Sequence, residues 1–331
     1  MKKLLVICGP TASGKTNVAL KLARLFKGEI LSADSRQVYK GMDIGTGKDT
    51  SGTKFVPHEM KEIKKTDQLR KLTFGYYRVK ATKIWGLDIV SPEYAFNIAD
   101  YVIYAREVLG LIWSQGKLPL LVGGSGLYLN AVTNTPETID VPLIPELRQE
   151  LSNLSLDNLQ KKLRGLNPLR WQRMNKSDRA NPRRLTRAIE IALSKQKGHK
   201  RKIETNIDIL KIGLTPIRET LYQQIDRRVE ERLKNGMEKE VRQLLSSGLV
   251  QSVQARSATG YREFLGVLKT VDRSLSNEEL EDIVQRWKFA EHAYARRQLT
   301  WFKKDKDIHW FDPAEPNYYQ KVVETVRDWY N

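Results

Sequence analysis

The sequence contains little cysteine and histidine, and this scarcity excludes two common ways of stabilising a fold. Its single cysteine, Cys8, rules out an intramolecular disulfide framework, and its place in an apolar run indicates a small buried residue. The four histidines are scattered without the spacing of metal ligands, so a structural zinc site is not expected. We therefore expect a cytoplasmic protein that works in a reducing environment.

Long apolar runs are also missing. No stretch of 18 or more apolar residues occurs, which argues against a transmembrane helix. Met1–Lys3 leads directly into an apolar strand pattern, so no targeting peptide is expected. Acidic residues are scarce relative to basic ones, because 39 Asp and Glu stand against 57 Lys and Arg, for a formal net charge of +18. This imbalance favours a polyanionic partner, and nucleic acid is preferred over a membrane surface.

What the sequence does contain is a phosphate-binding motif near its start. Gly9–Thr16 reads GPTASGKT, and it lies between the apolar run Leu4–Cys8 and a helical pattern, which is the arrangement of a P-loop. Its glycines let the backbone wrap closely around an anion, and the start of the helix presents free N–H groups to that anion. Lys15 adds a positive charge and Thr16 offers a hydroxyl to Mg²⁺. The motif predicts a ligand that carries a di- or triphosphate.

Strand and helix patterns alternate after this motif. Short strands are predicted at Glu29–Ser32, Leu87–Val90 and Leu118–Val122, with a helix over residues 99–113. The polar segment 40–83 is predicted to be a loop with at most one short helix. The alternation predicts an α/β fold with a P-loop NTPase-like parallel sheet core and helices on both faces.

The pattern changes at about residue 131. Residues 131–203 are helical and polar without obvious strands, and we expect them to form an inserted all-helical domain between core segments 1–130 and 204–331. The part from Lys161 to Lys202 holds 15 Lys and Arg and only two acids. A charge run is usually a solvated face, but this near absence of acids favours a surface that faces RNA or DNA.

The sheet is predicted to resume at Ile207–Leu214 and to be followed by helices. The first two are separated by Asn235-Gly236, and the second is expected to close at Gly248. A long helix farther on has an aromatic and apolar face that is interpreted as core rather than as a base-stacking platform: Ile283, Trp287, Ala290, Tyr294 and Trp301.

The P-loop alone leaves several reactions open. Nucleotide-hydrolysing motors hold Mg²⁺ with an Asp at the end of a second strand, but the strand Leu118–Val122 ends in Gly-Gly. Asp34 follows the strand at 29–32 and should face the same crevice as Lys15. It is either a helix N-cap or a general base that receives a proton from a nucleophile. Arg218 is either an ordinary surface charge or a group that neutralises a diphosphate.

Five blocks together carry a resemblance that covers nearly the whole chain. They are Gly9–Thr16, Asp34–Lys48, Leu121–Tyr128, Asn181–Glu190 and Arg296–Phe302, and the second is far more specific than a P-loop. With these blocks the chain resembles the tRNA dimethylallyltransferase family. In that family the P-loop holds dimethylallyl diphosphate, and the prenyl group passes to N6 of the adenosine 3′-adjacent to the anticodon.

The resemblance implies a role for each matching residue. Asp34 would accept the N6 proton, Thr11 would contact the bridging region of the diphosphate, and Thr16 would hold Mg²⁺. It implies a set of residues that bind the diphosphate: Gly9, Thr11, Ala12, Ser13, Gly14, Lys15, Thr16 and Arg218. It also implies a set that binds the anticodon stem-loop of tRNA: Ser35, Gln37, Tyr39, Lys48, Gly124, Arg183, Arg184, Arg187, Arg296 and Arg297. We expect a monomer that acts on position 37 of tRNAs reading codons that begin with U.

Two stretches depart from the family pattern. The chain reads Trp85-Gly86-Leu87-Asp88 where the family usually has His-His-Leu-Ile-Asp, and the segment Thr50–Ile84 is longer than expected. Two other functions therefore remain open at this point. One is a P-loop small-molecule kinase or nucleotide hydrolase, and the other is an RNA-binding protein with a degenerate active site.

Overall fold

The computed structural model describes residues 1–48, 50, 52–65, 68–135, 138–139, 141–194, 207–247, 252–268 and 273–331, with backbone alone over the parts of 59–71 that it includes. The chain divides into two compact units. The core unit consists of Met1–Asn134 and Ile203–Asn331, and the inserted unit is Thr135–Lys202, against the 131–203 expected from the sequence. Within the described residues, no helix has both the length and the apolarity needed to cross a bilayer.

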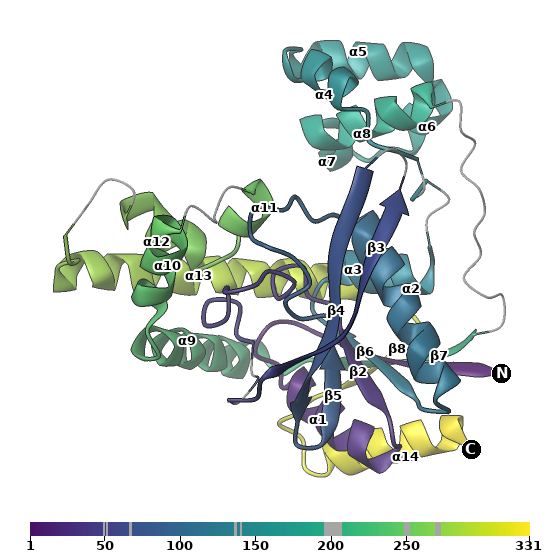
Figure 1. The fold of residues 1–331 in the computed structure, drawn as a ribbon, viewed down its shortest axis with the longest axis vertical. Helices are drawn as coiled ribbons and strands as arrows, with labels where there is room; N and C mark the ends of the chain where they lie inside the picture. The colour runs from purple at the N-terminus through teal and green to yellow at the C-terminus, as the bar shows by residue number, and fades with distance from the viewer. Residues whose placement is uncertain are drawn as a thin grey trace. The chain divides into compact units, whose positions relative to one another are not determined.

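The core unit is built on one sheet of eight strands in the order β3-β4-β5-β2-β6-β1-β7-β8 (Figure 1). The six strands from β5 to β8 in this order are parallel, whereas β4 pairs antiparallel with both β3 and β5. The strands are β1 Lys2–Cys8, β2 Glu29–Ser32, β3 Phe55–Lys65, β4 Gln68–Val79, β5 Thr82–Trp85, β6 Pro119–Gly123, β7 Ile207–Leu214 and β8 Ile308–Phe311.

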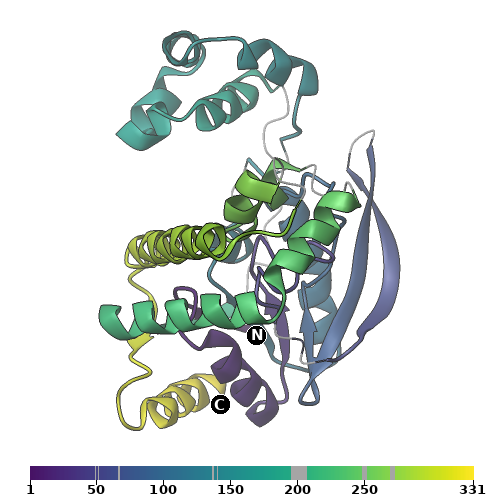
Figure 2. The same cartoon turned by 90° about the vertical axis from the view of Figure 1, so that its left-hand side faces the viewer.

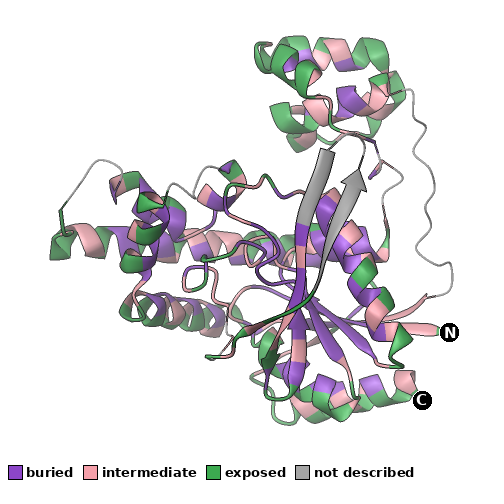
Figure 3. Ribbon diagram, in the orientation of Figure 1, coloured by how far each residue is buried: buried purple, intermediate pink, exposed green. Residues whose placement is uncertain are grey.

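Helices cover both faces of this sheet because its central strands are apolar on both sides. In β1, Leu5 and Ile7 belong to one buried cluster with α1 and α14, while Leu4, Val6 and Cys8 belong to another with α2 and α13. Successive side chains of a strand point to opposite faces, so a continuous apolar run requires cover on each. Figure 3 shows this sheet as the buried centre of the core unit, and the predicted fold class is confirmed.

The core-unit helices begin and end close to the predicted signals. Asn97 and Asp100 form a capping box at the start of α2, and the predicted helix 99–113 is confirmed. The predicted closing residue Gly248 lies outside the described residues. The helices are α1 Lys15–Leu25, α2 Ile98–Ser114, α3 Gly126–Thr133, α9 Arg218–Lys234, α10 Met237–Ser246, α11 Val253–Arg256, α12 Tyr261–Leu268, α13 Asn277–Phe302 and α14 Tyr318–Tyr330. Figures 1 and 2 show α9 and α13 running side by side.

The prediction of a loop over residues 40–83 was wrong, and so was the strand predicted at Leu87–Val90. Strands β3 and β4 form a long antiparallel hairpin, which curves along the sheet edge in Figure 2, and β5 follows it. Val90 makes only an isolated bridge with Tyr39. A hairpin at the edge of a sheet needs only one apolar face. Its many polar residues therefore give it the sequence pattern of a loop. Strand β8 and helix α14 were not predicted either.

The inserted unit is a small helical bundle with its own core. Its described helices are α4 Pro145–Ser152, α5 Leu156–Leu166, α6 Pro168–Arg173, α7 Lys176–Arg179 and α8 Pro182–Leu193. Helix α8 carries apolar residues on one face and arginines on the other, which is the pattern of an amphipathic surface helix. The apolar faces of the helices pack together through Leu151, Leu159, Leu163, Leu185, Ala188 and Ile189.

Candidate active site

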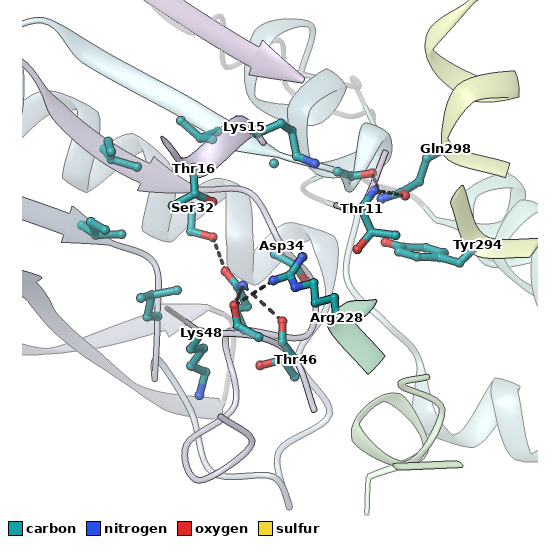
Figure 4. A pocket seen from close by; sticks show the side chains of 18 of the residues that line it. Thr11, Lys15, Thr16, Ser32, Asp34, Thr46, Lys48, Arg228, Tyr294 and Gln298 are labelled. Carbon is teal, nitrogen blue, oxygen red and sulfur yellow. Dashed lines mark hydrogen bonds between the residues drawn. The ribbon is translucent and has the colours of Figure 1, made fainter. Parts of the chain in front are cut away.

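A cavity of about 790 Å³, part of it open to solvent, lies at the carboxyl ends of the parallel strands in the core unit. Its wall combines the P-loop, the segment after β2, the end of β5, the β6–α3 turn and the inner faces of α9 and α13. In Figure 4, side chains from these separate segments converge on one space. This edge is where open α/β sheets bind their ligands.

The P-loop forms one end of the cavity through Thr11, Lys15 and Thr16. Gly9 has φ +142°, and a Cβ there would lie 2.3 Å from the Leu214 carbonyl oxygen, so this turn requires glycine. Gly14 has φ +84° as the N-cap of α1. This geometry presents the start of α1 to the cavity, as an anion site requires.

The other two P-loop residues predicted to bind the diphosphate have different surroundings. Ala12 packs against a cluster formed by α9 and α13. The Ser13 hydroxyl is buried and has no hydrogen-bond partner among the described residues. Neither residue is among those that line the cavity, so their predicted contacts with the diphosphate stay predictions.

The cavity is strongly cationic. It is lined by Lys15, Lys48, Arg228 and Arg232. Burial, helped by the Arg228 guanidinium and opposed by Asp34, lowers the pKa of the Lys15 ammonium from its ordinary value to about 8. A buried ammonium group with a guanidinium group nearby favours a ligand with several negative charges.

Asp34 lines the same cavity as Lys15, as the sequence predicted. Its Oδ1 accepts the backbone N–H of Arg36 at 2.8 Å, which fixes the carboxylate in a turn. No helix follows, so the helix N-cap interpretation was wrong. Two tyrosines lie near it: the buried Tyr101 donates to the Ser32 carbonyl at 2.9 Å, and Tyr294 lines the cavity. Burial raises the pKa of Tyr294, and the charge of Asp34 adds to this effect.

An apolar wall forms another part of the cavity lining. It consists of Ile30, Val122, Ile84 and Leu87, which come from β2, β6, β5 and the turn after β5. None of them was predicted as a site residue, because in the sequence each has the pattern of an ordinary core residue. A cavity with a cationic end and an aliphatic wall matches a ligand that joins phosphates to a hydrocarbon chain.

Gln298 of α13 ties two parts of the site together. Its Oε1 accepts the Thr11 N–H at 2.8 Å, and its Nε2 donates to the Gly124 carbonyl at 2.9 Å. The side chain is buried, and no room exists for a Cβ at Gly124, which would lie 2.2 Å from Nε2. Gln298 was not predicted as a site residue. An amide on a buried helix face, four residues before the buried Phe302, was the available signal.

The two cavity arginines of α9 were also missed. Arg228 donates to the Gly47 carbonyl at 3.3 Å. Arg232 is buried and pairs with the buried Glu291 at 3.4 Å. Gly47 has φ +64°, and a Cβ there would overlap both guanidinium groups. The glycine of the second block therefore allows α9 to present its arginines to the cavity.

Of the residues predicted to contact tRNA in the second block, two have polar roles near the cavity. Gln37 lines it, accepts a hydrogen bond from Ser32 at 3.0 Å and donates to the Thr46 carbonyl at 3.3 Å. The Ser35 N–H donates to the Ser125 hydroxyl at 3.2 Å.

The other two are inaccessible from the surface. Tyr39 is fully buried in the core, so its prediction as an RNA contact was wrong. The Lys48 side chain is 1% exposed and pairs with Asp43 and Asp88, so it lines the cavity and does not face external phosphates. Their motif positions could not reveal this burial, which depends on how the segment packs onto the sheet.

The predicted arginines fall into two groups. Arg183 and Arg184 are exposed on α8, and Arg296 and Arg297 are exposed on α13. Arg187 is different, because it donates to the Thr138 and Val141 carbonyls at 3.1 and 2.8 Å and pairs with the buried Glu190. This guanidinium therefore holds the inserted unit together, and the predicted contact of Arg187 with RNA stays a prediction.

Arg218 is the first residue of α9, and its guanidinium lies 5.3 Å from the centre of the Tyr222 ring. It is not among the residues that line the cavity. Its predicted contact with a diphosphate therefore stays a prediction. The residues that depart from the family pattern are buried near the site: the Trp85 indole donates to Glu29 at 2.7 Å, and the Gly86 N–H donates to the Tyr104 hydroxyl at 3.2 Å.

The site fits Mg²⁺ better than a metal that needs several protein ligands. The described residues hold no group of three or more His, Cys, Asp or Glu side chains that could chelate a metal. Mg²⁺ keeps most of its waters and commonly takes one or two protein ligands together with substrate phosphates. Thr16, beside Lys15 on the cavity wall, can supply such a hydroxyl.

Comparison with known proteins gives a consistent result. The family model described as IPP transferase matches residues 80–305, and the one described as isopentenyl transferase matches residues 2–59. The tRNA dimethylallyltransferase of Anoxybacillus flavithermus is 33% identical over 98% of this chain and 95% of its own length. The tRNA dimethylallyltransferase 1 of Geotalea daltonii is 36% identical over 94% and 91%. The full-length tRNA isopentenylpyrophosphate transferase of Bacillus halodurans superposes with a TM-score of 0.67 at 30% identity, covering 99% of this chain and 97% of the other.

Proposed function

Since the chain belongs to the IPP transferase family, whose relatives named above are tRNA dimethylallyltransferases, we propose that it prenylates tRNA. The donor is dimethylallyl diphosphate. The acceptor is N6 of the adenosine at position 37, next to the anticodon, in tRNAs that read codons beginning with U. Diphosphate is the second product.

One observation carries this proposal: a single cavity combines the P-loop, the Asp34 carboxylate and an aliphatic wall. Each part corresponds to one part of the reaction. The P-loop suits the diphosphate, the wall made by residues such as Ile84 and Leu87 suits a five-carbon prenyl group, and the carboxylate suits the acceptor amine. A kinase or nucleotide hydrolase gives no reason for the aliphatic wall so close to the phosphate site.

In the proposed reaction, the adenine N6 attacks C1 of the prenyl group. The N6–C1 bond forms, the C1–O bond to the diphosphate breaks, and the N6 proton passes to the Asp34 carboxylate. The Arg36 N–H holds Asp34 in place at 2.8 Å, so the carboxylate is oriented before the base arrives.

Leaving-group charge is the main electrostatic demand of this reaction. Lys15, Arg228 and the backbone N–H groups of the P-loop stabilise the developing negative charge on the diphosphate, and Arg218 joins them from the start of α9. Mg²⁺ held by Thr16 and the phosphates would neutralise part of that charge. Gln298 keeps the P-loop in register with the β6–α3 turn through its two hydrogen bonds.

The anticodon stem-loop is the proposed binding partner. An unpaired loop base leaves its stack at a cost of a few kcal/mol, less than for a base in a duplex. Arg183 and Arg184 of the inserted unit, and Arg296 and Arg297 of α13, are exposed and available for phosphate contacts.

The decisive experiment mixes the protein with labelled dimethylallyl diphosphate, Mg²⁺ and an anticodon stem-loop. We expect prenylated adenosine from the wild-type protein. Asp34→Ala should keep RNA binding and lose transfer. Absence of transfer combined with turnover of ATP would instead support a kinase or hydrolase, and tight RNA binding without product from any donor would support a degenerate active site.

A further inference from the structure

Two ladders of side chains meet where α9 packs against α13. Residues 218, 222 and 226 are spaced four apart on α9, and residues 292 and 296 are spaced four apart on α13, so each set lies on one helix face. The rings of Tyr222 and His292 stack with centroids 4.0 Å apart and planes 5° from parallel. The Asp226 carboxylate lies 2.8 Å from Nε2 of His292.

The stacked tyrosine holds two arginines. Arg296 donates to the Tyr222 hydroxyl at 2.8 Å, and the Arg218 guanidinium lies 5.3 Å from the ring centre, within cation–π distance. Burial alone would raise the pKa of Tyr222, but the positive charges of the neighbouring Arg296 and Arg218 and the hydrogen bond from Arg296 leave it below its ordinary value. Both arginines are exposed beyond this contact, so each can reach an anion.

The set of side chains on α9 lies beside the P-loop. Ala12 and Tyr222 both pack against the cluster formed by Leu221, Ile225 and Ala295. Two exposed cations held at the flank of a phosphate-binding loop face no carboxylate in any contact described for them. Ordering a long arginine side chain costs conformational free energy. An aromatic ring that already holds the side chain in place reduces the free energy lost when the ligand binds.

We propose that Tyr222 is a positioning residue that presents Arg218 to the donor diphosphate and Arg296 to an RNA phosphate. The inference rests on the proposed function, because it assigns the two anions to its two substrates. The ring acts on Arg218 through its face, whereas the hydroxyl acts on Arg296 through a hydrogen bond. The two effects can therefore be separated by substitution.

The test is steady-state transfer with labelled dimethylallyl diphosphate and an anticodon stem-loop. Tyr222→Phe keeps the ring and removes the hydroxyl, so the KM for RNA should rise about threefold while the KM for the donor stays within about twofold. Tyr222→Leu removes both supports, so the KM for the donor should also rise, by about fivefold. Tyr319→Leu is the matched control, because Tyr319 also lies under a cation, Lys21, but on α14. It should leave both KM values unchanged.

A double-mutant cycle separates positioning from mere packing. In an Arg218→Ala background, adding Tyr222→Leu should not raise the donor KM further. A further fivefold rise, equal effects of the Phe and Leu variants, or wild-type KM values in Tyr222→Leu would each overturn the proposal. Thermal melts show whether Tyr222→Leu is folded. If it is not, the effect of Tyr222→Phe on the KM for RNA decides the test.

Stem-loop binding measured by fluorescence anisotropy gives an answer that does not depend on turnover. Tyr222→Phe should weaken binding about threefold, and it should have no effect once Arg296 is already Ala. An equal effect in both backgrounds would overturn the role of the hydroxyl. A wild-type protein that binds RNA without transferring a prenyl group would contradict the proposed function, whereas an active wild type with unaltered Tyr222 variants would contradict only this inference.

Discussion

At the scale of single residues, Asp34 illustrates how one side chain can be both structural and reactive. Its Oδ1 accepts the Arg36 N–H, which any oxygen at that position could do, whereas a proton acceptor must be a carboxylate. Asp34→Asn separates the two roles because the amide oxygen still accepts the hydrogen bond. We expect kcat to fall by about 10²–10⁴-fold, the range for loss of a general base. Unfolding temperature and stem-loop affinity should stay at wild-type values, and near-normal kcat would refute the assignment.

Lys15 gives the site a dependence on pH. Burial brings the pKa of its ammonium in the free protein to about 8, and only the protonated form carries the charge that attracts diphosphate. Affinity for inorganic diphosphate should therefore be full below pH 8 and weaken as pH rises through that value. Bound diphosphate itself favours the protonated form, so the complex should titrate at higher pH than the free protein.

Calorimetric titration with inorganic diphosphate from pH 6.5 to 9.5 measures this effect. That range covers about 1.5 pH units on either side of the Lys15 pKa. In Lys15→Met the affinity should be lower throughout, and the part of the pH dependence centred near 8 should vanish. An unchanged pH profile in that variant would assign the titration to another group.

At the scale of elements, α13 connects the parts of the site. Gln298→Leu would leave the Thr11 N–H and the Gly124 carbonyl without their partner, which costs about 1–3 kcal/mol for each buried group. We expect a lower unfolding temperature and a higher KM for the donor. Gln320→Leu, on the exposed face of α14, is the control and should change neither. Equal melting curves for the two variants would show that the bridge contributes little.

The stability of the inserted unit includes a contribution from the buried Glu190. Burial opposes ionisation of Glu190, but hydrogen bonds from Arg148 and the Ile144 N–H leave its pKa below the ordinary value. A lowered folded-state pKa means that the charged form stabilises the unit above the unfolded pKa of about 4.3, and that this contribution is lost as pH falls through the lower value. Melts of the full chain between pH 7 and pH 3 should show this loss.

Glu190→Gln tests the assignment, because it keeps the shape of the side chain and removes its charge. The variant should be less stable than wild type at pH 7, and the difference should narrow toward pH 3. A difference in stability that stays constant with pH would mean that the charge of Glu190 does not contribute to the stability of the protein.

Elements also show where local patterns mislead. Helix α2 and strand β6 were predictable because helical periodicity and a continuous apolar run are local features. Strands β3 and β4 were not, since the pairing of β3 with β4 and of β4 with β5 supplies the stability that their own sequence lacks. Trp301 was predicted to lie in the core, yet it is 36% exposed, because the last turns of α13 pack only partly against α3.

At the scale of the whole molecule, the net charge of +18 predicts salt-dependent RNA binding. Each phosphate contact contributes about one unit to the slope of log affinity against log salt concentration. Replacing Arg183 and Arg184 with Ala should reduce that slope by about 1–2 units. Replacing the exposed Arg24, in the last turn of α1, should not alter that slope. Filter binding across a salt series measures both, and identical slopes would exclude α8 from the RNA interface.

The sequence by itself determined the P-loop, the strand before it, the position of Asp34 and the helical character of the insertion. Each follows from glycine positions or from the period of apolar residues within a few turns of chain. It could not determine which side chains close the cavity. Ile84, Arg228, Tyr294 and Gln298 come from segments far apart in the chain, and sheet order and the packing of α9 on α13 bring them together. The same packing buried Tyr39, whose motif position suggested contact with RNA, because burial depends on neighbours that only the tertiary structure supplies.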